Sequence, residues 1–295
     1  MNNYVLTCCS TADLSKEHFE KRNIQVVYFH FELDGVEYLD DCGASMPPEE
    51  LFRRMDAGAD TKTSQVSVAE YTDFWKKYLE QGLDILHVTL SSGISGTYQS
   101  AMIAKEDLAE LYPDRKILVV DSLAASSGYG LLMDKLADLR DGGMGIEDLY
   151  AWAEDNKRRL HHWFYTNDLT YFIRGGRVSK TAGMVGQLLS ICPLLNVDHQ
   201  GRLTPREKIR GVKKVMQRTV DVMEAHAQGG KAYNGKCYIC QSLREEQAAD
   251  IAGMIEARFP ELDGKVQIYP IGATIGSHTG PGTIAVFFWG DRRED

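Results

Sequence analysis

The stretch I-L-H-V-T-L-S-S-G-I-S-G-T-Y-Q-S-A, residues 85–101, decides the fold of this chain. Its first six residues form an apolar run that is typical of a buried strand, a loop of serines and glycines follows, and a helix begins near Gly96. A strand that passes through a short loop into a helix is typical of α/β proteins, in which parallel strands alternate with helices. The stretch therefore predicts an α/β fold.

The same alternation extends through the first half of the chain. Ser67 and Glu70 match a capping box and fix the start of one helix. Helices of this length between strands indicate a mainly parallel sheet that is covered on both faces. The predicted strands are 4–9, 24–33, 84–90 and 116–122, and the predicted helices are 47–58, 68–82, 96–113 and 128–143.

The pattern changes around residues 141–162, and we expect two domains, 1–155 and 156–295. A charged amphipathic helix at 146–160 could bridge them. The second domain reads as α+β, because strands and helices there follow no strict alternation. Its predicted strands are 161–167, 235–242, 266–272 and 283–290, with a hairpin at 194–207, and its predicted helices are 183–195, 208–228 and 245–260.

Composition excludes several classes of protein. The 295 residues include 33 basic and 42 acidic side chains, a net charge of −9, which argues against broad nucleic-acid binding. No apolar run approaches the roughly 20 residues that span a bilayer, and the N-terminus does not read as a signal peptide. We therefore expect a cytoplasmic protein without structural disulfides.

The pair Cys237 and Cys240 has the spacing of a metal-binding or redox motif. However, the segment around it reads as a strand, in which residues three apart point to opposite faces. No second cysteine pair follows. We expect buried strand cysteines and predict no metal site.

The loop that ends the strand at 84–90 is the first candidate binding site. Ligands of open α/β sheets bind beyond the carboxyl ends of the strands, and a helix N-terminus presents free N–H groups to an anion. Ser95 can donate a hydrogen bond to a bound oxygen, or it can simply cap the helix that starts at Gly96. The loop lacks the patterns of nucleotide-binding loops.

Two further segments carry polar side chains without an evident structural task. Thr63 and Ser64 lie in a predicted polar loop, where the alternative is an ordinary surface position. Arg174 and Arg177 flank two glycines. Arginines in a turn are usually solvated, but one that faces a cleft would hold a carboxylate or a phosphate.

The segment T-I-G-S-H-T-G-P-G-T, residues 274–283, reads as a flexible turn that carries one histidine. A histidine among glycines has little local reason to belong to a core, although exposed loop histidines are also common. The glycines would let His278 and the backbone come close to a ligand. His278 is therefore a further candidate binding residue.

Four motifs stand in one order along the chain. They are C-S-T-A-D-L from Cys9, T-S-Q-V-S from Thr63, S-S-G-I-S-G-T-Y-Q-S-A from Ser91, and G-G-R-V-S at 175–179, which is followed by I-G-S-H-T-G-P-G at 275–282. Together they resemble the DegV family of fatty-acid-binding proteins over essentially the whole chain. The resemblance implies a two-domain α/β protein that holds one long-chain fatty acid between its domains and needs no other cofactor.

The resemblance also implies the residues of the site. The family's carboxylate-binding threonine and serine match Thr63 and Ser95, and its histidine before the G-P-G turn matches His278. Ser64 and Gly96 are the neighbours expected to assist. Segments 29–33 and 183–195 are our candidates for the wall of the acyl tunnel.

Some members of the family work with a fatty acid kinase. In those members the bound acid is presented for phosphorylation, and the acyl phosphate enters phospholipid synthesis. The resemblance thus implies a lipid-binding partner of an ATP-dependent kinase, with no catalytic residue of its own. The family's basic residue beside G-G-R matches Arg174 or Arg177. The stretch with Arg210, Lys213 and Lys214 could dock the kinase, or it could be a plain solvated face.

One position departs from the family pattern. The family's first strand usually ends in Asp-Ser-Thr, whereas this chain has Cys9, Ser10 and Thr11. A thiol therefore replaces an acidic group near the head-group region. We expect a buried apolar cysteine, with a modifiable thiol as the alternative.

Two other functions stay open from the residues alone. Ser95 and His278 could form the nucleophile and base of an acyl hydrolase or transferase, but such a base needs a third group to orient it, and the sequence offers none. A DNA-binding regulator is disfavoured by the net charge and by the lack of a recognition motif.

Overall fold

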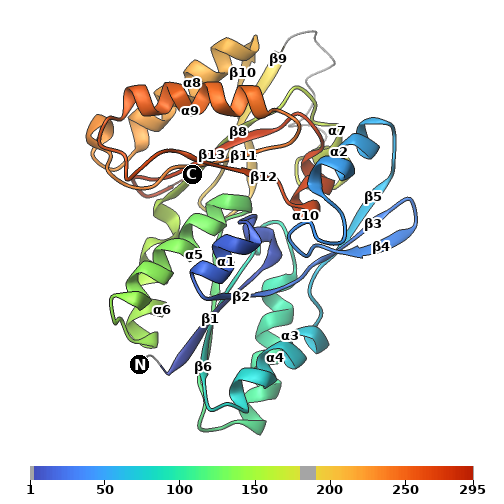
Figure 1. The fold of residues 1–295 in the computed structure, drawn as a ribbon, viewed down its shortest axis with the longest axis vertical. Coiled ribbons are helices and arrows are strands. Elements are labelled where there is room, and N and C mark those ends of the chain that lie inside the picture. The colour runs from blue at the N-terminus through green and yellow to red at the C-terminus, as the bar shows by residue number, and fades with distance from the viewer. Residues whose placement is uncertain (1–2, 180–190, 295) are drawn as a thin grey trace.

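The computed structural model describes residues 3–179 and 191–294, which form three β-sheets with helices packed around them. Figure 1 shows the first half of the chain below and to the right and the second half at the top. Helix α5 (Ser126–Asp141) lies between the halves: it packs against strands of the second half, and its Tyr129 hydroxyl hydrogen-bonds to Cys9 and Val88 of the first. Within the two described ranges, no helix is long and apolar enough to cross a bilayer.

A four-stranded parallel sheet forms from strands that the sequence predicts. Its order is β2 (Ile24–Val27), β1 (Tyr4–Cys9), β6 (Asp84–Thr89) and β7 (Ile117–Asp121). All of β1, and all of β6 except its first residue, is buried. Such continuous burial is typical of parallel strands that helices cover on both faces. The expected parallel sheet is confirmed.

The helices around this sheet also follow the sequence. α3 (Val68–Leu79) begins with the predicted capping box, in which the Ser67 hydroxyl accepts from Glu70 N–H and the Glu70 carboxylate accepts from Ser67 N–H at 2.8 Å. Besides α3 and α5, the α-helices that precede the second half are α1 (Lys16–Lys21), α2 (Pro48–Asp56), α4 (Thr97–Leu111) and α6 (Ile146–Asn156).

The segment 24–33, predicted as one strand, is two strands in different sheets. The parallel pairing ends after β2. At Phe29 the backbone instead bonds outside both sheets: its N–H donates to Ser10 Oγ, and its carbonyl accepts from Asp40 N–H. It then enters an antiparallel sheet of order β4 (Val36–Leu39), β3 (His30–Leu33) and β5 (Thr61–Ser64). Asp34 and Gly35 have positive φ and close the β3–β4 hairpin.

The second half forms a six-stranded mixed sheet, so the predicted α+β pattern is confirmed. Neighbouring strands of this sheet pair antiparallel, except for the last two strands in its order, which pair parallel. The strands of the parallel sheet end by residue 121 and those of this sheet begin at 160, while the division at 155/156 stays a prediction. The order is β10 (Leu203–Arg210), β9 (Ile191–Val197), β8 (Leu160–Tyr165), β13 (Ile284–Trp289), β11 (Tyr238–Gln241) and β12 (Gln267–Pro270).

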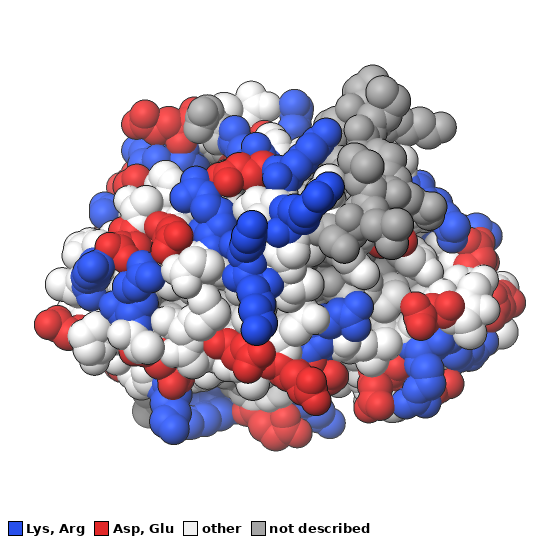
Figure 2. All heavy atoms as spheres, turned by 90° about the horizontal axis from the view of Figure 1, so that it is seen from above, with Lys and Arg blue, Asp and Glu red and all other residues white. Residues whose placement is uncertain are grey.

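Helices α8 (Val212–His226) and α9 (Glu245–Arg258) cover the outer face of the mixed sheet. Figure 2 views this end of the molecule from above, and Lys and Arg side chains gather in a band across its middle. The remaining helices, α7 (Thr170–Arg174) and α10 (Ala273–Thr279), pack against each other at the boundary with the small antiparallel sheet.

Two predicted helices of the second half are wrong in part. Residues 191–195 of the predicted helix 183–195 belong to β9, and residues 180–190 lie outside the described residues. The predicted helix 208–228 begins only at Val212, because β10 continues to Arg210 and Gly211 turns the chain at φ 94°. Exposed and half-buried side chains alternate over the second part of β10, as in an edge strand.

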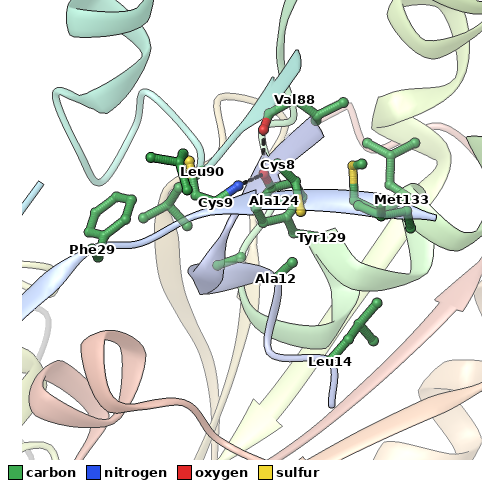
Figure 3. Close-up of a cluster of buried hydrophobic side chains, with 14 of the residues drawn as sticks. Cys8, Cys9, Ala12, Leu14, Phe29, Val88, Leu90, Ala124, Tyr129 and Met133 are labelled. Atoms are coloured by element: carbon green, nitrogen blue, oxygen red, sulfur yellow. Dashed lines mark hydrogen bonds between the residues drawn. The ribbon is translucent and has the colours of Figure 1, made fainter. Parts of the chain in front are cut away.

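Two apolar clusters fill the interior. On β13 the side chains alternate between them: Ala285 and Phe287 face the parallel sheet and α5, whereas Val286 and Phe288 face α8 and α9. Cys237 and Cys240 likewise fall in opposite clusters, as predicted. Figure 3 shows the first cluster beside β1, where the Tyr129 hydroxyl accepts from Cys9 N–H and donates to the Val88 carbonyl.

Candidate functional site

A cavity of about 270 Å³ lies between the two halves of the chain. The first half contributes loops at the carboxyl end of the parallel sheet, and the second half contributes the inner face of the mixed sheet. Most of the wall is apolar. Its larger side chains are Phe29, Leu90, Ile94, Phe164, Phe172, Val197, Leu203, Ile271, Ile275 and Phe287.

One part of the wall is polar and joins three predicted residues. Thr63 Oγ1 lies 2.8 Å from His278 Nε2, and Ser95 lines the same cavity. These residues come from β5, α10 and the loop after β6, which are far apart along the chain. The hydroxyls predicted from two loops and the histidine predicted from a third segment therefore meet in one place.

Thr63 and Ser64 lie on a strand rather than in the predicted loop. Side chains of β5 alternate between half-buried and exposed positions, so Thr63 faces the cavity while Ser64 faces solvent. The structure therefore does not bring Ser64 to the proposed head-group site. The strand was missed because its four polar residues, T-K-T-S, carry no apolar alternation.

His278 lies on the short helix α10 rather than in a flexible turn. The glycine-rich sequence hid this helix, yet the glycines permit close packing. A Cβ on Gly175 would lie 2.2 Å from His278 Nδ1, and one on Gly276 would lie 2.5 Å from the Phe52 ring. Burial, aided by the charge of Arg177, lowers the pKa of His278 to about 4. The imidazole is thus neutral at pH 7.

Asp40 anchors α10, and sequence analysis missed it. Its carboxylate accepts from two N–H groups in the first turn of the helix, those of Ala273 at 3.3 Å and Thr274 at 3.2 Å. It also accepts from Ser10 Oγ. Burial raises the pKa of Asp40. A carboxylate at a helix N-terminus satisfies free N–H groups and the dipole, so Asp40 fixes the element that carries His278. The sequence Asp40-Asp41 gave no spacing signal for this contact.

Ser95 satisfies both alternatives of the sequence analysis, whereas Gly96 only begins the helix. Ser95 Oγ accepts from Thr97 N–H at 3.2 Å at the start of α4, and the same side chain lines the cavity. Gly96 is the N-cap of α4 but does not line the cavity. A Cβ there would lie 2.8 Å from Oε1 of Gln65, a cavity residue that donates to Ser100 Oγ and that the sequence did not single out.

The structure distinguishes the two candidate arginines. Arg177 lines the cavity, donates through Nε to the Ile94 carbonyl at 3.1 Å, and is half-buried. Arg174 is exposed, lies 3.6 Å from Asp60 and stacks over the Tyr171 ring. Arg174 lines a surface depression outside the cavity, to which Thr63, Arg177 and His278 also contribute. The polar part of the cavity wall therefore adjoins the protein surface.

Cys9 is fully buried, as expected, and does not line the cavity. Its sulfur lies 3.1 Å from the Tyr71 hydroxyl, which in turn lies 2.8 Å from Thr97 Oγ1 at the start of α4. Burial raises the pKa of Cys9 to about 11. His87 lies 3.7 Å from the sulfur, but burial lowers its pKa to about 3, so it stays neutral and cannot stabilise a thiolate.

The expected tunnel walls are only partly used. In segment 29–33, Phe29 lines the cavity while Phe31 and Leu33 belong to the core. Most of segment 183–195 lies outside the described residues, and its described part, 191–195, does not line the cavity. The neighbouring hairpin contributes Val197 and Leu203 instead.

The predicted basic stretch is exposed, but it is not one helix face. Arg210 ends β10, whereas Lys213 and Lys214 lie in the first turn of α8. Arg206 and Lys208 are exposed at alternate positions before Arg210 and extend the stretch along the edge strand. Arg218, farther along α8, forms an ion pair with Glu207 at 2.7 Å.

The geometry does not supply a hydrolytic centre at Ser95 and His278. His278 Nε2 pairs with Thr63, and its buried Nδ1 has no hydrogen-bond partner in the part of the chain that the structure describes. A catalytic base needs the nucleophile on one nitrogen and an orienting group on the other. The hydroxyl of Ser95 instead accepts from the Thr97 amide.

Known proteins resemble the chain over its whole length. Residues 7–291 match the sequence model of the DegV family, described as an uncharacterised protein. A DegV domain-containing protein of Clostridium perfringens is 37% identical over 294 residues, with 100% of both chains covered.

Solved structures agree with the fold described above. The structure of a DegV family protein from Thermus thermophilus, reported for its fatty acid binding, has a TM-score of 0.87 at 28% identity and covers 98% of this chain and 100% of its own. A stearic-acid-binding protein from Eubacterium ventriosum has a TM-score of 0.86 at 26% identity, with 97% and 98% of the two chains covered. The α/β fold with a parallel and a mixed sheet is therefore confirmed over the full length.

Proposed function

The chain belongs to the DegV family, and on that premise we propose that it binds one long-chain fatty acid in the cavity between its two halves. Two relatives of known structure are described as fatty-acid-binding proteins. The protein would act as a carrier that holds the acid, with no catalytic residue and no cofactor of its own.

The observation that carries the proposal is the composition of the cavity wall. Aromatic and aliphatic side chains cover most of it, and the polar groups gather around Thr63, Ser95 and His278. Burying an acyl chain contributes about 0.8 kcal/mol per methylene, so ten methylenes supply about 8 kcal/mol. The carboxylate must keep its hydrogen bonds when it leaves water, which the polar groups allow.

The neutral state of His278 suggests how the head group is held. With its proton on Nε2, His278 donates to Thr63 Oγ1 and leaves the Thr63 hydroxyl proton free for the carboxylate. Ser95 can donate a second hydrogen bond, and the guanidinium of Arg177 lies near enough to act on His278 electrostatically. In this arrangement His278 orients Thr63, and Arg177 balances the charge of the acid.

The head-group assignment is tested with three alanine variants. We expect Thr63→Ala and Ser95→Ala each to weaken binding of stearate by about tenfold, since each removes a hydrogen bond to a charged group worth about 1.5–3 kcal/mol. Ser64→Ala is the matched control, because Ser64 is adjacent in sequence but exposed. Calorimetric titration of each delipidated variant with stearate measures the three affinities. Equal affinities for all three variants and the wild type would overturn the assignment.

We further propose that the bound acid is presented to an ATP-dependent fatty acid kinase. Thr63, Arg177 and His278 line both the cavity and the surface depression next to it, which favours access to the carboxylate from outside. The exposed basic residues Arg210, Lys213 and Lys214 offer a docking face in a chain whose net charge is −9. The kinase would supply ATP and Mg²⁺, and this protein would orient the carboxylate oxygen.

Docking is tested by charge reversal. Lys213→Glu with Lys214→Glu should raise the concentration of carrier that half-saturates a fatty acid kinase by about tenfold, while stearate affinity stays unchanged. The matched control reverses Lys76 and Lys77, an adjacent exposed pair on α3. An equal effect of both double variants would show that net charge alone matters and would contradict the docking face.

A further inference from the structure

Three metal-ligating side chains converge on the mixed sheet, away from the cavity. His161 lies on β8, His226 is the last residue of α8, and Asp291 follows the end of β13. Each offers one ligand atom, and these atoms lie within 4.8 Å of one another. We propose that His161, His226 and Asp291 bind one divalent transition-metal ion of the Zn²⁺ class.

The distances between the ligand atoms suit such an ion. Asp291 Oδ1 lies 2.8 Å from His161 Nε2, and Asp291 Oδ2 lies 3.2 Å from His226 Nδ1. Zinc holds nitrogen and oxygen ligands at about 2.0–2.2 Å in a tetrahedron, so its ligands stand roughly 3.3 Å apart. A small outward movement of the carboxylate therefore makes room for the ion. The ion would replace the hydrogen-bonding protons between the two imidazoles and the Asp291 carboxylate.

The backbone holds the ligands in place before any ion arrives. Asp291 N–H donates to the carbonyl of His226 at 2.9 Å, and His161 pairs with Phe288 across β8 and β13. A Cβ on Gly290 would lie 2.3 Å from the His226 carbonyl oxygen, so only glycine lets the chain turn there. Three elements that are remote in sequence are thus fixed against one another, as a metal site requires.

Aromatic neighbours orient both imidazoles. His161 stacks on Phe288 at 5.2 Å with an angle of 8° between the rings, and His226 stacks on Trp163 at 6.0 Å with an angle of 22°. The side chain of His161 is 5% exposed, whereas His226 and Asp291 are 39% and 58% exposed. The site can therefore take an ion from solvent and leave a coordination position for water.

The ligand set also selects the kind of ion. Two imidazoles with one carboxylate favour Zn²⁺, Ni²⁺ or Cu²⁺, whereas Mg²⁺ and Ca²⁺ prefer oxygen ligands. The positive charge of Arg293 acts on His161 and opposes a bound cation. With three ligands and this repulsion, we expect micromolar rather than nanomolar affinity for Zn²⁺. The bound ion would link β8, α8 and the segment after β13, and so stabilise the mixed sheet.

The test is a titration of the untagged, chelator-treated chain with ZnCl₂ by calorimetry. We expect one ion per chain, and at least a tenfold loss of affinity in His226→Ala and in Asp291→Asn. Both residues are exposed enough to be changed without opening the core. His30→Ala is the matched control, because His30 also lies beside two carboxylates, Glu37 and Glu70, but is no part of the cluster.

Co²⁺ as a second probe separates this site from the cysteines. Bound at the cluster, Co²⁺ should quench the fluorescence of Trp163, which stacks on His226, and should give no thiolate-to-metal absorption band. The proposal is overturned by a thiolate band, by the absence of stoichiometric binding, or by affinities in His226→Ala and Asp291→Asn that match the wild type.

Discussion

His278 illustrates how a single residue depends on its surroundings here. Burial, aided by the positive charge of Arg177, keeps the imidazole neutral, while Nε2 pairs with Thr63 and the ring packs closely against Gly175. A neutral histidine can hydrogen-bond to a hydroxyl and orient it without itself forming an ion pair with the bound carboxylate. At the residue scale, the function proposed for His278 is therefore positioning rather than catalysis.

The depressed pKa of His278 predicts a pH dependence of stability. The unfolded chain binds a proton near pH 6.5, but the folded chain does not bind it until about pH 4. Between these values the unfolded state holds more protons, so the free energy of unfolding falls as the pH drops from 6.5 to 4. The contribution is fully present above pH 6.5 and amounts to about 3 kcal/mol, since each unit of pKa difference is worth about 1.4 kcal/mol.

Urea unfolding of the wild type and of His278→Gln at pH 7 and pH 4.5 measures this contribution. Glutamine does not titrate, so the variant should lose less stability than the wild type over the same interval. Other buried histidines, such as His87 and His161, act equally in both proteins and cancel in the comparison. Parallel losses in the two proteins would contradict the assignment to His278.

At the element scale, short polar segments place the site. β5 has four polar residues and α10 has seven residues, yet these two elements present Thr63 and His278 to each other. Neither would be stable alone, because a short helix or a single edge strand gains little without tertiary packing. α10 is held by Asp40 at its start and by α2 and α7 along its sides.

Removing the Asp40 cap should therefore loosen α10. We expect Asp40→Ala to lower the free energy of unfolding by about 1–2 kcal/mol, the usual value of a helix cap, and to weaken fatty-acid binding through displacement of His278. Asp40→Asn keeps one acceptor and should lose less. Asp41→Ala is the neighbouring control, because the Asp41 carboxylate accepts from the N–H and the hydroxyl of Ser45 rather than from α10. Chemical unfolding and stearate titration check both effects, and unchanged affinity in Asp40→Ala would contradict the link.

At the scale of the whole molecule, the cavity lies between the two halves of the chain and is lined by both. Its wall includes Phe29 and Leu90 from the first half and Phe164 and Phe287 from the second. An apolar cavity of about 270 Å³ costs on the order of 6 kcal/mol when nothing fills it, less whatever relaxation recovers. A bound acyl chain would thus stabilise the contact between the halves as well as itself.

Delipidation should accordingly lower the thermal stability. We expect the melting temperature to fall by at least about 5 °C after removal of lipid, since each kcal/mol shifts it by roughly 2–4 °C in a chain of this size. Added stearate should restore it by mass action, whereas butyrate, which is too short to fill the cavity, should not. Differential scanning calorimetry compares the three states. Restoration by butyrate would show that the carboxylate, rather than the acyl chain, provides the stability.

Much of the fold could be predicted from local signals. The parallel strands are apolar runs in the sequence, and the capping box of Ser67 and Glu70 marks the start of α3. The errors fall where local and tertiary preferences conflict: T-K-T-S of β5 and A-T-I-G-S-H-T of α10 lack the periodicity of a strand or helix. Residues 191–195 carry an apolar run that fits either a buried helix or a buried strand.

The site divides in the same way. The sequence by itself determined the α/β pattern, the family resemblance and the candidate residues Thr63, Ser95 and His278, because these depend on residue type and local order. Only the tertiary structure decided that Ser64 faces outward, that Arg177 rather than Arg174 lines the cavity, and that Asp40 anchors the helix of His278. The physical reason is that side-chain direction and long-range hydrogen bonds follow from how distant elements pack, which no local pattern of residues encodes.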